Sequence, residues 1–108
     1  MNLLELNEKI DRIQKCLLMK TITVEAFSEK INCPVIQMPK RQFPGIVIQG
    51  DSLKVLLGLS EEVISFADKK NEEDLKETAL ELKELLSGYM KIYEAAMQNN
   101  GKELPYPK

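Results

Sequence analysis

The chain has 108 residues and a formal net charge of −2, and it contains neither histidine nor tryptophan. This length fits one domain, and the charge argues against a general nucleic-acid binder, which would usually show a basic surface. No apolar run is long enough to span a membrane. The N-terminal segment contains acidic residues and does not have the pattern of a signal peptide. We therefore expect a cytoplasmic protein.

The first predicted element, within residues 1–20, is an amphipathic helix from Asn2 to about Met19. Its apolar residues recur at helical spacing and form one stripe: Leu3, Leu6, Ile10, Ile13 and Leu17. Asn2 and Glu5 resemble a capping box at its start. The stripe has two interpretations. We favour packing on the chain's own domain, and the alternative is the seam of a homodimer.

Residues 21–50 predict a β-meander of three short strands. The three strands are Thr21–Phe27, Pro34–Met38 and Ile46–Gln49. The first alternates between apolar and polar residues, and the third begins with a run of β-branched residues. Strands this close in sequence pair most simply in antiparallel fashion.

The connection between the second and third strands predicts a turn and a small basic patch. Pro44 and Gly45 suit the centre of a type II turn, in which the glycine takes a positive φ. Lys40 and Arg41 lie in the same loop and are candidates for binding an anion or a partner. Basic loop residues are more often only solvated.

Residues 51–100 predict a helical hairpin, followed by an extended tail over 101–108. Gly50 bends the chain and Asp51 or Ser52 caps a helix over 52–69. Gly58 leaves open whether this helix is one bent element or two short ones.

The second helix of the hairpin, from about Glu72 to Gln98, is the strongest signal in the chain. Asn71 caps it, and Gly101 follows its end. It carries one long apolar stripe: Leu75, Ala79, Leu82, Leu86, Tyr89, Tyr93 and Met97. In the tail, Leu104 and Tyr106 are expected to fold back onto the body.

Together these elements predict a single α+β domain. A small three-stranded antiparallel sheet is packed by the N-terminal helix and by a C-terminal antiparallel helical hairpin.

The start of the first hairpin helix also matches a catalytic motif. Gly50-Asp51-Ser52-Leu53 resembles the signature of the GDSL esterases and lipases, in which the serine is the nucleophile. That chemistry needs a histidine base, which this chain lacks. A strand, a glycine and a helix start also form an anion-friendly geometry, but no phosphate-binding glycine motif is present.

A longer motif carries a second resemblance. Arg41-x-Phe43-Pro44-Gly45, followed by Gln49-Gly50-Asp51-Ser52-Leu53, resembles the core of a family of small bacterial domains of unknown function. The pattern is R-x-F-P-G, three aliphatic residues, then Q-G-D-S-L. The match covers roughly residues 22–108 and implies two helices and a short Pro/Tyr tail. The resemblance brings no reaction and therefore no catalytic residues.

The cysteines predict no metal or redox chemistry. Cys16 and Cys33 lack C-x-x-C spacing, and without histidine a zinc site would need carboxylates to complete it. Two buried thiols are favoured over a disulfide. We expect no metal and no cofactor.

The acids are concentrated in the helical hairpin. Glu73, Glu77 and Glu81 follow at four-residue steps and line one helical edge. The simplest interpretation is a solvated helix face. The functional one is an acidic surface that steers a basic partner.

These observations favour a non-catalytic protein-binding domain. Its most concrete form is a bacterial immunity protein that occludes a basic toxin domain through Glu73, Glu77 and Glu81. The alternatives are a homodimeric assembly protein that pairs through its N-terminal helix and, least favoured, a small hydrolase that uses Ser52.

Overall fold

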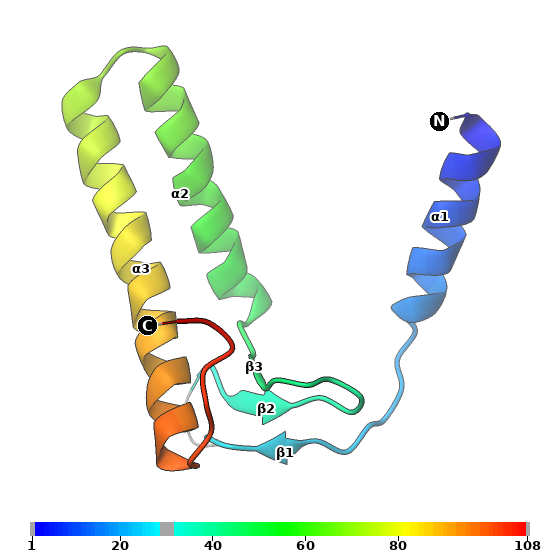
Figure 1. The fold of residues 1–108 in the computed structure, drawn as a ribbon. Coiled ribbons are helices and arrows are strands. Elements are labelled where there is room, and N and C mark those ends of the chain that lie inside the picture. Colours follow the sequence, from blue (N-terminus) through cyan, green and yellow to red (C-terminus); the bar gives the residue numbers. More distant parts are fainter. Residues whose placement is uncertain (1, 29–31, 108) are drawn as a thin grey trace.

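The computed structural model describes residues 2–28 and 32–107 and confirms the α+β fold class. A three-stranded antiparallel sheet, an N-terminal helix and a C-terminal helical hairpin are all present (Figure 1). In chain order the elements are α1 (Leu3–Cys16), β1 (Glu25–Ala26), β2 (Val35–Gln37), β3 (Gly45–Ile46), α2 (Gly50–Asp68) and α3 (Glu72–Asn99).

The sheet has the predicted topology but much shorter strands. Its order is β1-β2-β3, and both pairings are antiparallel, with Ala26 opposite Ile36 and Val35 opposite Ile46. The prediction that Thr21–Phe27 is one long strand was wrong, because β2 in the centre offers only three residues for pairing. One hydrogen bond extends the pairing at each edge, from Phe27 N–H to the Val35 carbonyl and from Val47 N–H to the Pro34 carbonyl.

The turn before β3 does not lie at Pro44 and Gly45. Gly45 is part of β3, and the positive φ falls on Lys40, at 65°. The Arg41 N–H donates to the Met38 carbonyl at 3.3 Å, which closes the turn around Pro39 and Lys40. The Gln37 side chain also donates to the Arg41 carbonyl at 2.6 Å. This side-chain bond spans the turn at Pro39 and Lys40 and favours the earlier position.

α2 is one continuous helix that runs through Gly58, so the choice between one helix and two is settled. Its N-cap is Gln49, in an extended conformation and without a side-chain capping bond, so the prediction of a cap at Asp51 or Ser52 was wrong. The helix begins at Gly50, which places both residues inside the first turn. There the Asp51 carboxylate accepts from the Ser52 N–H at 2.8 Å.

The two ends of α3 lie where the sequence predicts them. Asn71 Oδ1 accepts a hydrogen bond from the Asp74 N–H, which is the predicted side-chain cap. Gly101 has a φ of 65°, as its place after the helix end requires. In the short link between α2 and α3, Lys70 also takes a positive φ, of 56°.

The core lies where the C-terminal half of α3 meets the sheet. Val35 of β2 is fully buried, and it packs with three buried residues of α3: Tyr93, Ala96 and Met97. The tail folds back onto this cluster as predicted, because Leu104 and Tyr106 pack against it. Figure 1 shows the tail crossing α3 beside the sheet.

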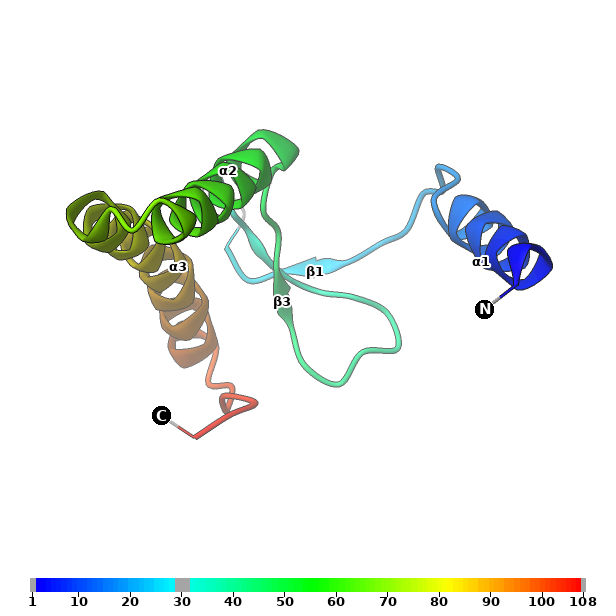
Figure 2. The same cartoon turned by 90° about the horizontal axis from the view of Figure 1, so that it is seen from above.

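α1 does not pack on the domain, which corrects the favoured interpretation of its stripe. It contacts none of the other helices and strands that the structure describes. Figures 1 and 2 both show α1 standing apart from the hairpin, joined to β1 by an extended segment. The radius of gyration is 18.2 Å, against about 13 Å for a compact chain of this length. The irregular residues before β1 carry α1 away from the sheet, so its apolar stripe stays uncovered.

Candidate functional site

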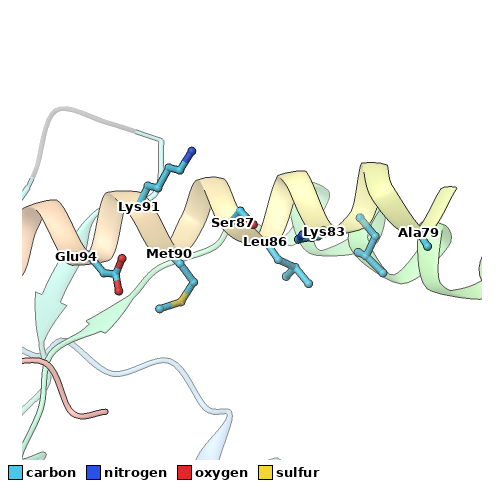
Figure 3. A pocket seen from close by; sticks show the side chains of 8 residues that line it. Ala79, Lys83, Leu86, Ser87, Met90, Lys91 and Glu94 are labelled. Atoms are coloured by element: carbon cyan, nitrogen blue, oxygen red, sulfur yellow. The ribbon is translucent and has the colours of Figure 1, made fainter. Parts of the chain in front are cut away.

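A shallow apolar groove, widely open to solvent, runs along one side of the middle of α3. It has a volume of about 510 Å³ and is lined by Ala79, Leu82, Lys83, Leu86, Ser87, Met90, Lys91 and Glu94. Leu86 is 47 % exposed and Met90 is 41 % exposed. Figure 3 shows Leu86, Met90 and Glu94 projecting from the same side of the helix. An exposed apolar patch can mark a site of interaction with a protein, a membrane or a ligand.

The groove is the uncovered part of the long apolar stripe predicted for α3. Tyr93 and Met97, at the C-terminal end of the stripe, are buried against the sheet and the tail. Leu75, Leu82 and Tyr89 are half-buried, whereas Ala79 and Leu86 are exposed. Sequence reasoning identified the stripe but did not predict that its middle part stays uncovered. α2 packs along α3 and the sheet meets only its C-terminal part, so the side of the stripe around Leu86 has no neighbouring element in the described structure.

Charged groups border the groove. Lys83 and Lys91 are exposed at its edge, and Glu94 lies at the end nearest the tail. The Tyr106 hydroxyl donates to Glu94 Oε2 at 3.1 Å. Burial, helped by the hydrogen bond and the negative charge of Glu94, raises the pKa of Tyr106. This bond holds the tail at the end of the groove nearest the C-terminus of α3.

The predicted acidic edge is exposed, and it faces away from the groove. Glu73, Glu77 and Glu81 all lie on the solvent side of α3. Glu77 and Leu86 are nine residues apart, and nine residues are two and a half helical turns, so they lie on opposite sides of the helix. A partner in the groove would not contact this edge directly.

The other predicted binding residues belong to a different part of the molecule. Lys40 and Arg41 are exposed in the loop between β2 and β3 and help to line an open groove of about 450 Å³. Glu73, Glu77 and Glu81 lie toward the opposite end of the hairpin, near the link from α2 (Figure 1). The structure therefore does not bring the predicted basic and acidic residues into one site.

The remaining candidate residues make local contacts. Ser52 is half-buried, and its N–H donates to the neighbouring Asp51 carboxylate, which occupies one of the donors at this helix start. Cys33 is a buried free thiol, whereas the side chain of Cys16 lies outside the described part of the structure. Within residues 2–28 and 32–107, no group of three metal-ligating side chains gathers. No helix in these ranges has the length and hydropathy to cross a bilayer.

The fold and the groove define a small α+β domain with an open apolar surface. A model of a family of unknown function, DUF6959, matches residues 19–106, and the chain belongs to this family. The match confirms the expectation of an unknown-function family, and it starts after α1. Neither the search of curated proteins nor the search of solved structures found a match.

Proposed function

We propose that the chain is a non-catalytic protein-binding domain whose α3 groove receives an amphipathic helix. The observation that supports this proposal is the exposure of Leu86 and Met90 at the centre of an apolar groove. An amphipathic helix laid into an apolar groove is a recurring mode of recognition. The groove extends over about 22 Å of α3, taken at 1.5 Å per residue, which is the length of a helix of about four turns.

The openness of the groove favours a protein over a small molecule. Its lining comes from one helix, so it has a floor but no enclosing walls. Small-molecule sites usually enclose most of the ligand's surface. A helix needs only one face covered, because its polar side remains in water.

The acidic edge supports a role in steering. Glu73, Glu77 and Glu81 are exposed and adjacent, and a cluster of one sign accelerates the approach of a partner of the other sign. The partner would then be basic overall and would dock through an apolar face. A bacterial immunity protein that occludes a basic toxin domain is one concrete form of this function.

Recovery of bound proteins from the source cells tests the groove. Leu86→Asp places a charge at its centre and should abolish recovery of a specific partner. Ile64→Asp is the matched control, because Ile64 is an aliphatic residue of the same hairpin, 62 % exposed and outside the groove lining. If the wild-type protein and both variants recover the same proteins in equal amount, the groove is not a binding site.

A separate variant tests the steering. Joint reversal of Glu73, Glu77 and Glu81 to lysine should slow association with the recovered partner, and the effect should shrink at high salt. Stopped-flow measurement of the association rate at two ionic strengths gives both quantities. An association rate that is unaltered at low salt would remove the acidic edge from the proposal.

A further inference from the structure

The C-terminal tail and the groove occupy one face of α3. Leu86, Met90 and Glu94 of the groove lie on the same side of the helix (Figure 3), and Met97 follows about one turn after Glu94. Met97 is buried in the cluster against which the tail packs, whereas Leu86 and Met90 are exposed. The Tyr106 hydroxyl bonds to Glu94 at the boundary between these two parts. The tail therefore sets the point at which the open part of this face ends.

Within the described residues, side chains alone hold the tail after Lys102. Leu104 and Tyr106 are half-buried and the residues on either side of each are exposed, so alternate residues of an extended segment face the body. Residues 103–107 form no backbone hydrogen bond with the described parts of the chain. Two of them, Pro105 and Pro107, have no N–H to donate. A segment held by so few contacts can open without unfolding the rest of the protein.

We infer that the tail is a releasable strap, and that a partner entering the groove displaces Tyr106 from Glu94 and extends along α3 onto the surface that the tail covers. This inference rests on the proposed function, because it concerns the partner of the same groove. It adds that the binding surface is longer than the open groove and that the chain carries its own competitor for one end of it.

The charges of the groove fit a basic partner that competes for Glu94. Among the described residues that line the groove, Glu94 is the only acid, whereas Lys83 and Lys91 border the edge. The lysines repel the basic groups of the partner and the carboxylate attracts them, which directs them to the end of the groove where the tail is held. Tyr106 offers Glu94 an uncharged donor, whereas a lysine or arginine of the partner offers a charged one.

The apolar contacts of the tail keep the strap closed until a partner arrives. Leu104 and Tyr106 pack against the buried cluster around Met97, so opening returns apolar surface to water. A partner that lays its own apolar side chains on the same cluster replaces this contact. The partner therefore shifts the strap toward its open state, and the cost of opening lowers the apparent affinity of the closed protein.

Fluorine NMR of protein labelled with 3-fluorotyrosine observes the strap directly. The chain has three tyrosines, so three Tyr→Phe variants assign the signals. Glu94→Ala removes the acceptor of the Tyr106 hydroxyl and should move the Tyr106 signal toward its position in the urea-unfolded chain. The signal of Tyr89, which lies outside the groove lining, should stay in place. A Tyr106 signal that Glu94→Ala leaves unchanged would overturn the strap.

An amphipathic helical peptide of leucine and lysine, of about 14 residues or four turns, is the probe for displacement. Its binding should move the Tyr106 signal of the wild-type protein to the released position. Tyr106→Phe should bind the peptide about fivefold more tightly, because one hydrogen bond fewer opposes the release. Tyr89→Phe is the matched control, and its dissociation constant should stay within about twofold of wild type.

The outcomes separate the strap from the groove. Peptide binding that Leu86→Asp abolishes, but that leaves the Tyr106 signal in place, would overturn the strap and still support the proposed function. Equal affinities of the wild-type protein and Tyr106→Phe would also overturn it. If none of these proteins binds the peptide, the strap is not a competitor. Recovery of a cellular partner that depends on Leu86 would then still support the proposed function.

Discussion

The Tyr93 hydroxyl donates a hydrogen bond to the backbone carbonyl of Pro44 at 2.9 Å. The two residues are 49 positions apart, so this bond ties the buried face of α3 to the residue that leads into β3. Tyr93 is only 6 % exposed and belongs to the core cluster. It is therefore both a packing residue and the polar link between the helical hairpin and the sheet.

Removing this hydroxyl should destabilise the fold. We expect Tyr93→Phe to lower the free energy of unfolding by about 1 kcal/mol, the usual net value of one hydrogen bond. Tyr89→Phe is the matched control, one turn earlier on α3, and should cost less than about 0.5 kcal/mol, as substitutions away from such features usually do. Urea unfolding followed by circular dichroism measures both. Equal losses in the two variants would show that the bond to Pro44 contributes nothing.

The burial of Tyr93 also predicts a loss of stability in alkali. Burial raises the pKa of Tyr93 above its ordinary value of 10.0, so the folded state holds its proton more tightly than the unfolded state. This contribution is fully present below pH 10 and is lost as the pH rises through the pKa of the folded state. Tyr93→Phe should make the decline above pH 10 shallower. Part of the decline should persist, because the pKa of Tyr106 is raised as well.

The link between α2 and α3 contains a position where glycine should stabilise the protein. Lys70 has a φ of 56°, in the left-handed region, which costs a residue with a side chain about 1–2 kcal/mol. Lys70→Gly should raise the free energy of unfolding by about 0.5 kcal/mol after the greater freedom of glycine in the unfolded chain is counted. The neighbouring Lys69 has a φ of −82°, so Lys69→Gly should lower stability instead. Thermal unfolding of the pair gives the two signs, and a shared sign would contradict the argument.

The two helices of the hairpin differ in how they are capped, and the difference is measurable. Asn71 accepts a hydrogen bond from the Asp74 N–H, so Asn71→Ala should lower the free energy of unfolding by about 1 kcal/mol. Gln49 makes no side-chain capping bond, so Gln49→Ala should change stability by less than about 0.5 kcal/mol. Chemical denaturation of both variants tests this. A larger loss at Gln49 than at Asn71 would contradict the capping assignment.

Local chemistry was enough to predict much of this fold. The cap at Asn71, the left-handed Gly101 and the course of α3 depend on contacts within a few residues, so they can be read directly from the chain. The antiparallel order of the strands follows from their closeness in sequence. The glycine turn failed because the Gln37 side chain, bonded to the carbonyl of Arg41 across the loop, favours a different position.

What only the tertiary structure decided is which apolar surfaces are covered. The stripe on α1 and the stripe on α3 look alike in sequence, since periodicity shows that a helix has an apolar face but not what lies against it. The sheet and the tail cover the C-terminal end of α3, around Tyr93 and Met97, and α2 packs along another side of the helix. The extended segment before β1 carries α1 away from the sheet. The uncovered groove at Leu86 and the unpacked α1 both follow from these non-local facts, and the proposed function depends on the first of them.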